Sequence, residues 1–503
     1  MSDGLLHPSR FAAEAPDRPA VIEGATGAVL TYGQLEERSC RVAHLLASVG
    51  CEPGDHVAVL VENRLEFFEV VWGALRSGLY VTPINWHLSP DEAAYIVEDC
   101  GASVLFASAA LGEMVPGVPR GFAIGGDLPG FTPYEEAVAA QPATPRAEEC
   151  EGTWMLYSSG TTGKPKGIKP PRVGEPLGSG GGFVLLVQGL YGADGDSVYL
   201  SPAPLYHAAP AGWTTAMHRL GATTVIMDRF DPVEVLRLVE RYRVTHAQFV
   251  PTHLVRMLRV PEDERARYDL SSLRMAVHAA APCPPEVKRA AIEWLGPVVH
   301  EYYSGSEGAG FCAIDSEEWL AHPGSVGRSL LGAVHIVGPD GDEVALGQEG
   351  QVWFESRARF EYHGDPEKTA AAFDDRGWST LGDIGRLDED GYLYLTDRVS
   401  NMIISGGVNV YPREVEDVLI LHPAVHDVGV VGVPDDEMGQ RVVAFVQLEP
   451  GAGADDALAG ELVAWCRERL THYKCPTEVR FLEELPRLPT GKLLKRALSG
   501  PGI

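Results

Sequence analysis

The alternation of short apolar runs with helix-like patterns constrains the fold of this chain more than any other feature of its sequence. In the first third, apolar runs predict strands at 56–61, 80–84 and 104–106. The segments between them carry apolar residues at helical spacing, and Ser89 followed by Pro90 is a typical helix start. Strands that alternate with helices in this way are typical of a parallel sheet.

The same alternation returns between about residues 196 and 299, with VYLSP, TTVIM, HAQFV and MAVHA as strands and a helix predicted from Pro232 to Arg243. From about 324 to 396 short strands broken by Gly and Asp predict β-hairpins. The last part of the chain alternates again, with strands predicted at 428–433, 441–448 and 478–481 and a helix at 458–470.

We therefore expect an α/β fold. Its large N-terminal domain should contain two α/β sheet subdomains and a small β subdomain, followed by a smaller, mobile C-terminal α+β domain. A chain of 503 residues agrees with this expectation, because a single core rarely keeps growing to that length.

The formal net charge of -29 excludes several kinds of partner. Affinity for nucleic acids and for acidic lipid surfaces rests on Lys and Arg, so we expect no nucleic-acid partner. A chain this acidic can still bind a small polyanion where basic groups and backbone N–H donors are concentrated. Any local basic cluster is therefore informative.

The cysteines and the N-terminus indicate a cytoplasmic protein with reduced thiols. No two of the eight cysteines form a C-x-x-C pair, which argues against a metal or disulfide framework. The N-terminal MSDGLLHPSRFAAEAPDR has no apolar stretch long enough for a signal peptide, and no uncharged run approaches the roughly 18 residues of a membrane span. The cysteines are Cys40, Cys51, Cys100, Cys150, Cys283, Cys312, Cys466 and Cys475.

The run YSSGTTGKPKGI at 157–168 has the composition of a phosphate-binding loop. Its hydroxyl groups and cations attract phosphate oxygens, and its glycines allow backbone N–H groups to approach closely. A plain surface loop is the alternative for a tract rich in Ser, Gly and Lys. The run is not a Walker A loop, because Lys164 is followed by Pro165 rather than by Ser or Thr, so a generic P-loop nucleotidase is disfavoured.

This run resembles, almost residue for residue, the signature of the adenylate-forming superfamily, which includes acyl-CoA synthetases, adenylation domains of peptide synthetases, and luciferases. Six further segments resemble the family's elements and occur in the family's order. They are PLYHAAP at 204–210, YYSGSEG at 302–308, LGDIG at 381–385, TDR at 396–398, SGGVNVYPREVE at 405–416 and LPRLPTGKLLKR at 485–496. In wording the chain is most similar to bacterial acyl-CoA synthetases that take fatty or bulky alicyclic acids.

The resemblance implies a reaction in two steps, with ATP, Mg²⁺ and CoA as cofactors. A carboxylate first attacks the α-phosphate of ATP to give an acyl adenylate and pyrophosphate, and the acyl group then passes to the thiol of CoA. The resemblance also implies an N-terminal domain at 1–398, with its β subdomain at about 324–396, and a C-terminal domain at 399–503 that rotates about a hinge at Ser400.

The roles of the nucleotide-binding residues are likewise implied by the resemblance. Thr161, Thr162, Gly163 and Lys166 hold the β- and γ-phosphates, Ser306 contacts the α-phosphate, and Tyr303 stacks on adenine. Asp383 and Arg398 bind the ribose. Glu307 and Thr162 ligate Mg²⁺, and both are counted with Lys492 as catalytic. Residues implied to bind the nucleotide are Ser158, Ser159, Gly160, Thr161, Thr162, Gly163, Lys166, Tyr303, Ser306, Asp383 and Arg398.

Five further positions carry over from the family. His207 matches the gate beside the acyl pocket, and Gly305 lines that pocket. Gly406 and Gly407 line the channel for CoA. Lys492 bridges the carboxylate and the α-phosphate during adenylation and leaves before thioester formation.

Three features of the sequence bear on the hinge and on the choice of acid. Ser400 and Asn401 stand where the family commonly has charged residues, which puts a charge-based hinge latch in doubt. The stretch KPPRVGEPLGSGGG after the phosphate loop is short of side chains, which predicts an enlarged acyl pocket. The segment after the gate, LYHAAPAGWTTAMHRL, lacks the acidic residue that pairs with an amino group, which favours a carboxylic acid without an amine.

Two alternatives remain open at this point. The chain could instead load the acyl group onto the thiol of an acyl carrier protein, or it could be a catalytically silent binding protein of the same fold. The sequence also leaves open the identity of the acid and the oligomeric state, a homodimer included.

Overall fold

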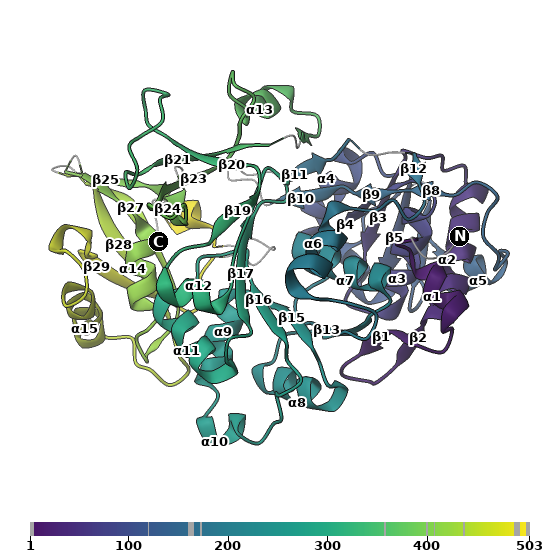
Figure 1. Cartoon of the computed structure of the whole chain (residues 1–503), viewed down its shortest axis with the longest axis horizontal. Helices are drawn as coiled ribbons and strands as arrows, with labels where there is room; N and C mark the ends of the chain where they lie inside the picture. Colours follow the sequence, from purple (N-terminus) through teal and green to yellow (C-terminus); the bar gives the residue numbers. More distant parts are fainter. Residues whose placement is uncertain are drawn as a thin grey trace.

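The computed structural model describes the chain at residues 5–118, 120–158, 165–171, 174–356, 359–398, 401–406, 408–435, 438–486 and 493–498. Two helix-covered sheets form most of the N-terminal part, and the C-terminal elements form a smaller α+β unit on the other side of the molecule (Figure 1). The α/β fold expected from the sequence is therefore confirmed.

The first sheet has six parallel strands in the order β7-β6-β5-β3-β4-β9. The three strands predicted in the first third of the chain all lie in it, and every residue of β3, β4 and β5 is buried. A strand covered on both faces reads as a continuous apolar run, as these do. The strands are β3 (His56–Leu60), β4 (Tyr80–Pro83), β5 (Val104–Ser108), β6 (Gly121–Ile124), β7 (Thr132–Pro133) and β9 (Thr153–Trp154).

The second sheet has nine strands in the order β19-β18-β17-β16-β15-β13-β14-β1-β2. Its inner neighbours, from β17 to β1, pair in parallel, and antiparallel pairs occur at the two edges. The strands are β1 (Pro19–Glu23), β2 (Val29–Thr31), β13 (Val198–Ser201), β14 (Thr223–Ile226), β15 (His246–Phe249), β16 (Met275–His278), β17 (Val299–Ser304), β18 (Phe311–Ile314) and β19 (Arg328–Leu331).

Helices cover these sheets and begin where their capping residues predict. The Ser89 side chain accepts a hydrogen bond from the Glu92 N–H, and the Glu92 carboxylate accepts one from the Ser89 N–H. The helix predicted from Pro232 ends at Tyr242, because Arg243 adopts a left-handed conformation. The helices are α1 (Pro8–Glu14), α2 (Tyr32–Ser48), α3 (Leu65–Leu75), α4 (Pro90–Asp99), η1 (Ala109–Met114), α5 (Tyr134–Ala139), α6 (Gly182–Tyr191), α7 (Ala208–Leu220), α8 (Pro232–Tyr242), α9 (Pro251–Arg259), α10 (Glu262–Arg265), α11 (Pro285–Leu295) and α12 (Ser316–Ala321).

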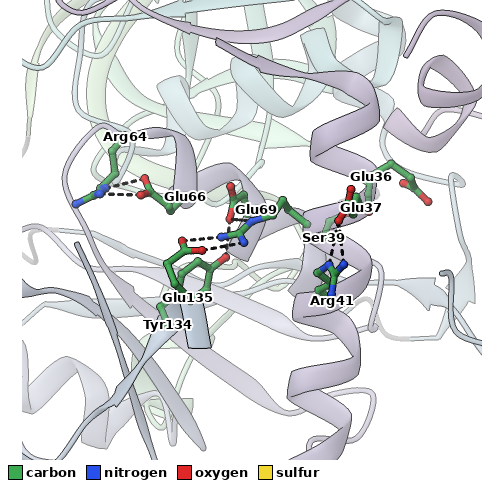
Figure 2. Close-up of polar contacts among 10 residues, drawn as sticks. Glu36, Glu37, Ser39, Arg41, Arg64, Glu66, Glu69, Tyr134 and Glu135 are labelled. Atoms are coloured by element: carbon green, nitrogen blue, oxygen red, sulfur yellow. Dashed lines mark hydrogen bonds and ion pairs between the residues drawn. The ribbon is translucent and has the colours of Figure 1, made fainter. Parts of the chain in front are cut away.

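Ion pairs and hydrogen bonds around the buried Glu69 tie the helices of the first sheet together. Arg38 of α2 pairs with Glu69 of α3 at 2.8 Å and with Glu135 of α5 at 2.7 Å. Tyr134 donates its hydroxyl to the same Glu69 at 2.8 Å, and Figure 2 shows Glu69, Tyr134 and Glu135 converging. These ion pairs and hydrogen bonds satisfy polar groups that would otherwise be costly to bury.

Antiparallel β structure follows the two large sheets, as the Gly- and Asp-rich turns predict. The four-stranded sheet β20-β21-β23-β24 is the main part, and β10-β11-β22 and β8-β12 form two further small sheets. The elements are β8 (Cys150–Glu151), β10 (Leu156–Ser158), β11 (Lys166–Lys169), β12 (Glu175–Pro176), β20 (Ala333–Val337), β21 (Gly350–Glu355), β22 (Glu361–Tyr362), α13 (Pro366–Ala371), β23 (Ser379–Leu387) and β24 (Leu393–Arg398).

The C-terminal elements form a five-stranded sheet with α14 and α15 packed on it. Arg259 of α9 donates to the backbone oxygen of Val425 at 2.7 Å and pairs with Glu449, which joins this unit to the second sheet. The elements are β25 (Ile403–Ser405), β26 (Val408–Val410), α14 (Pro412–Leu419), β27 (Val425–Asp435), β28 (Gly439–Leu448), α15 (Asp456–Arg467), η3 (His472–Lys474), β29 (Glu478–Leu482) and α16 (Lys495–Leu498).

The expected reduced thiols agree with the structure, since all eight cysteines are free. No helix in the described part of the chain is long and apolar enough to cross a lipid bilayer.

Candidate active site

The predicted phosphate loop connects two paired strands. β10 and β11 are antiparallel, with Ser158 opposite Lys166, and β22 adds to the outer side of β11. Lys166 therefore stands at the first position after the loop. Ser159, Gly160, Thr161, Thr162 and Gly163 lie outside the described residues.

Glu307 lies on a tight turn that follows β17. The Gly308 N–H donates to the Gly305 carbonyl at 3.0 Å, which leaves Ser306 exposed at the tip. A Cβ at Gly305 would lie 2.7 Å from Glu307 Oε2, so a larger residue there would displace the Glu307 carboxylate. Tyr362 of β22 donates its hydroxyl to Glu307 Oε1 at 2.9 Å, and this bond fixes the carboxylate beside the β10-β11 hairpin.

Lys166 and Glu307 belong to one group of charges. Burial lowers the pKa of the Lys166 ammonium, and the carboxylates of Asp365 and Glu307 oppose that change. Asp365 begins α13, directly after β22. A half-buried lysine between two carboxylates, at the end of a Gly- and Ser-rich loop, suits a ligand that carries both phosphate groups and a divalent cation.

Asp383 links three strands at the other end of the candidate site. Tyr303 of β17 donates its hydroxyl to Asp383 Oδ2 at 2.6 Å, and Arg398 at the end of β24 donates to Oδ1 at 3.1 Å. Burial, reinforced by Asp383, holds the pKa of Tyr303 well above its usual range, so Tyr303 remains a hydrogen-bond donor. Each carboxylate oxygen keeps a second lone pair, which leaves Asp383 able to accept from a sugar hydroxyl.

His207 lies at the start of α7 in an aromatic surrounding. Its ring centroid is 4.4 Å from that of Tyr206, and Tyr206 contacts Trp86 at 6.0 Å. Burial, reinforced by nearby His87, lowers the pKa of His207 to about 4, so the imidazole is neutral at neutral pH. A neutral ring suits the mouth of an apolar pocket.

Asn63 holds the segment that leads to His207. Its side-chain amide donates to the carbonyl oxygens of Ala203 at 3.1 Å and Met227 at 2.7 Å, and its oxygen accepts from the Leu205 N–H at 2.8 Å. Three hydrogen bonds from one buried side chain fix the backbone just before the gate.

The glycine-rich stretch after the phosphate loop packs closely at two of its glycines. A Cβ at Gly180 would lie 2.3 Å from Arg219 Nη1, and one at Gly178 would lie 2.4 Å from Leu5 Cδ1. Arg219 is itself buried in an ion pair with Glu151. A Cβ at Gly182 would meet nothing within 4 Å, so the enlarged acyl pocket stays a prediction.

Asp397 connects the last strand of the β sheet to the C-terminal unit. Its Oδ1 accepts from the Asn401 side chain at 3.0 Å, and its Oδ2 accepts from the Arg413 N–H at 3.1 Å. The position after the hinge, where the family commonly has a charged residue, is occupied by Asn401, which makes a hydrogen bond to Asp397. Ser400, the predicted hinge, lies outside the described residues.

Gly406 lies beside the start of β28 and is the described member of the three C-terminal residues predicted to act in the reaction. Gly406 has a φ of +57° and donates its N–H to the Met438 carbonyl at 2.8 Å. A Cβ at this position would lie 2.5 Å from Met438 Cε. Gly407 and Lys492 fall outside the described part of the chain.

Sequence reasoning missed two residues that support this site. Tyr362 contacts Glu307 only because β22 pairs with β11, and no local pattern around residue 362 indicates that pairing. Asn63 follows a predicted strand, which is where polar side chains reach the edge of a sheet, and that position could have drawn attention to it.

Metal ligands are sparse in the described residues. No group of three or more His, Cys, Asp or Glu side chains is placed there to hold a metal ion. A single carboxylate such as Glu307 still fits Mg²⁺, because Mg²⁺ is commonly bound by one or two carboxylates together with substrate phosphates and water.

Comparison with known proteins gives matches along almost the whole chain. The model for the AMP-binding enzyme family matches residues 9–361, and that for the AMP-binding enzyme C-terminal domain matches residues 414–492. The long-chain-fatty-acid–CoA ligase FadD13 of Mycobacterium tuberculosis is 33% identical over 497 residues, which cover 96% of this chain and 95% of the relative.

Two further matches bear on the acceptor and the fold. The fatty acid–[acyl-carrier-protein] ligase ScoC of Streptomyces coeruleorubidus is 32% identical, over 99% of this chain and 97% of its own. The crystal structure of the anthranilate CoA ligase AuaEII in complex with anthranoyl-AMP superimposes with a TM-score of 0.84 at 26% identity, covering 98% of this chain and 95% of that one.

Proposed function

Since this chain belongs to the AMP-binding enzyme family of adenylate-forming ligases, we propose that it activates a non-amino carboxylic acid with ATP and Mg²⁺ and transfers the acyl group to CoA. The chain is an AMP-forming acid–thiol ligase in its general class. One observation carries the finer proposal. Lys166, at the end of the predicted phosphate loop, lies within electrostatic reach of Glu307. Tyr303, on the strand that precedes Glu307, donates to Asp383, to which Arg398 also donates.

The first half-reaction joins two anions, so cations and N–H donors must stabilise the charge that develops. An oxygen of the acid's carboxylate bonds to the α-phosphorus of ATP, and the bond from that phosphorus to the bridging oxygen breaks, releasing pyrophosphate. Lys166 and the loop residues Thr161, Thr162 and Gly163 are proposed to hold the β- and γ-phosphates. Ser306 is proposed to contact the α-phosphate.

Asp383, Arg398 and Tyr303 are proposed to bind the nucleoside. The Asp383 carboxylate accepts from ribose hydroxyls while Tyr303 and Arg398 keep it oriented. The Tyr303 ring offers a flat surface to adenine. Because Tyr303 and Arg398 already bind Asp383, little conformational freedom is lost when ATP binds.

Glu307 is proposed to hold Mg²⁺ together with Thr162. Tyr362 orients the Glu307 carboxylate, and the second oxygen of that carboxylate is left for a cation. When bound, Mg²⁺ neutralises charge on the phosphate oxygens.

The second half-reaction is proposed to use a domain rotation about Ser400, with domains at 1–398 and 399–503. Lys492 leaves the carboxylate and α-phosphate, and the backbone at Gly406 and Gly407 lines the path of the CoA thiol. The thiol sulfur bonds to the acyl carbon, and AMP departs.

The acid is proposed to lack an amino group and to be fatty or alicyclic. The helix that follows His207, AAPAGWTTAMHRL, contains no Asp or Glu to pair with an ammonium group. An unpaired ammonium group in such a surrounding would be strongly disfavoured.

A second candidate acceptor is the thiol of an acyl carrier protein. The similarity to ScoC, whose name describes a carrier-protein ligase, favours keeping it. Both acceptors share the adenylation step, so the two proposals differ only in the thiol that receives the acyl group.

Mass spectrometry of the products tests the proposal. The protein is incubated with ATP, Mg²⁺ and a panel of fatty, alicyclic and amino acids, and then with CoA or with phosphopantetheinylated carrier protein. We expect acyl-AMP and acyl-CoA from acids without an amine. If acyl groups appear on the carrier protein but no acyl-CoA forms, the second candidate is correct. If no acid gives acyl-AMP or a thioester, the protein is a catalytically silent binding protein. Asp383→Asn serves as the matched control for adenylation.

A further inference from the structure

One arginine of α9 contacts three elements of the C-terminal unit. The Arg259 guanidinium donates to the backbone oxygens of Ile420 at 3.3 Å and Val425 at 2.7 Å, and it pairs with the carboxylate of Glu449. These three residues stand at the end of α14, at the start of β27 and directly after β28. A single side chain of the N-terminal part therefore holds all three elements.

The acceptors at this contact suit an arginine. Ile420 directly follows the last residue of α14, and the backbone oxygens at the end of a helix carry the negative end of its dipole. The Glu449 N–H donates to the Ala424 carbonyl at 2.9 Å, which keeps the carboxylate beside these oxygens. A planar guanidinium can donate to several oxygens at once, whereas the ammonium of a lysine is a compact point charge.

Apolar packing supports the same contact. Leu421, in the turn between α14 and β27, packs against the apolar core of the second sheet, to which Leu254 and Met257 of α9 belong. The C-terminal unit is thus held on α9 by a polar and an apolar contact that lie next to each other in the sequence. We name Arg259, Ile420, Leu421, Val425 and Glu449 the α9 contact.

The N-terminal part of the chain holds α14 at both ends, at different distances from the predicted hinge at Ser400. At the first turn of α14, Arg413 donates to the Leu395 carbonyl at 2.9 Å, and its N–H donates to Asp397 Oδ2 at 3.1 Å. The α9 contact lies at the other end of this eight-residue helix, about 12 Å away at the helical rise per residue. Displacement grows with distance from the axis, so a rotation about Ser400 can keep the Asp397 contact but must break the α9 contact.

The turn proposed to serve CoA lies away from the candidate site in this orientation. Gly406 lies between β25 and β26, and its neighbours Ile404 and Val408 are 50% and 44% exposed. β25 lies at the outer edge of the molecule, away from β10 and β11 (Figure 1). A turn that faces solvent does not line the path of a thiol to the acyl carbon. The orientation seen here therefore suits the first half-reaction, and the second requires another.

We infer that Arg259 is a positioning residue that holds the C-terminal unit in the orientation for adenylation, and that the α9 contact must break before the acyl group passes to the thiol. The inference rests on the proposed function. The partners of Arg259 within the described residues are not residues of the candidate site, so it acts through the unit that carries Lys492. The side chains of Arg259 and Glu449 are 32% and 29% exposed, so water can replace the contact in each cycle.

A reversible cross-link tests whether the α9 contact must break. Arg259→Cys and Glu449→Cys are combined, and oxidised glutathione joins the two thiols as a disulfide. Pyrophosphate release should persist, whereas conversion of supplied acyl adenylate and CoA to thioester should fall at least about 10-fold and return on reduction. Arg259→Cys alone, treated with the same oxidant, is the control and should not lose thioester formation.

The outcomes separate this inference from the proposed function. Thioester formation by the cross-linked protein at the rate of the reduced protein would overturn the inference, and so would loss of pyrophosphate release with thioester formation retained. No pyrophosphate release from the wild type with any acid would contradict the proposed function instead.

Single substitutions test the α9 contact without a cross-link, and they decide the question where the disulfide does not form. Arg259→Ala should lower kcat for pyrophosphate release by about 5-fold, with KM for ATP and the conversion of supplied adenylate not impaired. Arg259→Lys keeps the charge but not the planar group, so it should restore only part of the rate. Arg256→Ala removes an exposed arginine of the same helix that makes no ion pair within the described residues, and it should change neither half-reaction. Equal loss of both half-reactions in Arg259→Ala, or no loss of either, would overturn the inference.

Discussion

Buried polar groups are paired on the nucleotide side of the candidate site and unpaired in the core between α6, α7 and the second sheet. On the nucleotide side, Tyr303 and Arg398 both bind Asp383, and Tyr362 binds Glu307. In the core between α6, α7 and the second sheet, the Tyr199 hydroxyl and Trp213 Nε1 have no hydrogen-bond partner of standard geometry within the described residues. A site whose side chains bind one another is oriented before its ligand arrives. Unpaired buried polar groups instead cost free energy in the folded protein.

ATP is the same in every reaction cycle, so a fixed set of contacts suits it. The acid differs among relatives of this family, whose names include long-chain fatty acid and 2-succinylbenzoate ligases. The acyl pocket is therefore where this chain would differ from its relatives, and the following tests address the paired and the unpaired groups separately.

The largest effect is expected from Lys492→Ala, which removes the cation proposed to act on the nucleotide side. Loss of a charge that stabilises the transition state should reduce pyrophosphate release by about 10³-fold. Conversion of supplied acyl adenylate to thioester should persist, because this lysine has left by then. The two half-reactions are followed separately, and equal loss of both would refute the assigned role. Lys495→Ala, on the nearby α16, is the control and should retain both.

Asp383→Asn tests whether the paired network binds ATP. The substitution keeps the shape but weakens the hydrogen bonds from Tyr303 and Arg398, and charged hydrogen bonds contribute about 1.5–3 kcal/mol each. We expect kcat/KM for ATP to fall about 100-fold, with a smaller fall for Tyr303→Phe. Initial rates at varied ATP concentration measure this. A change confined to KM for the acid would show that Asp383 contributes to binding the acid and not ATP.

His278 is an exception to the pairing on the face that carries Tyr303, since neither of its ring nitrogens has a hydrogen bond within the described residues. Burial lowers its pKa to about 4, even though Glu301 lies 3.6 Å away. The unfolded chain therefore takes up the proton at about pH 6.5, before the folded protein does. Stability is thus lost as the pH falls from about 6.5 to about 4, and it rises again with pH.

The expected slope from His278 is about 1.4 kcal/mol of unfolding free energy per pH unit near pH 5. Denaturant unfolding of the wild type and of His278→Gln, measured between pH 4 and pH 7, isolates the contribution of His278 to the pH dependence of the unfolding free energy. The variant should show a slope smaller by about that amount. Identical slopes would mean that His278 titrates at its ordinary pKa and that its burial imposes no penalty on protonation.

The smallest effect compares two fully buried tyrosines. Tyr32→Phe removes a hydroxyl that donates to Ala222, so the unfolding free energy should fall by about 1 kcal/mol. Tyr199→Phe removes an unpaired hydroxyl and should leave the stability of the ligand-free protein unchanged or slightly raised. Denaturant midpoints measure both. A loss at Tyr199 as large as that at Tyr32 would erase the contrast between the paired and unpaired groups.

Much of the fold follows from the sequence because strands buried on both faces are continuous apolar runs. The strands predicted at 56–61 and 104–106 appear as β3 and β5, and Ser89 caps α4 as expected. Element ends are less predictable. The helix expected at 458–470 ends at Arg467, where the chain leaves the helix before η3.

The residues of the candidate site that lie within recognisable sequence motifs could be predicted. The contacts that depend on pairing between strands far apart in the sequence could not. Tyr303, Glu307 and Asp383 lie in motifs that resemble the family's, and the structure brings Tyr303 and Asp383 into contact. The bond from Tyr362 to Glu307 depends on strand pairing between β22 and β11. The space beside Gly180 is filled by the side chain of Arg219, which lies on α7, and the sequence around Gly180 does not indicate that contact.

Isotope exchange between pyrophosphate and ATP tests the central claim most directly. The protein is supplied with ATP, Mg²⁺, labelled pyrophosphate and an acid, with CoA left out, so that only reversible formation of an acyl adenylate can carry label into ATP. We predict labelled ATP that appears only when a suitable acid is present and that is nearly abolished in Asp383→Asn. Release of ADP and phosphate instead, or exchange that does not depend on the acid, would contradict carboxylate activation by this chain.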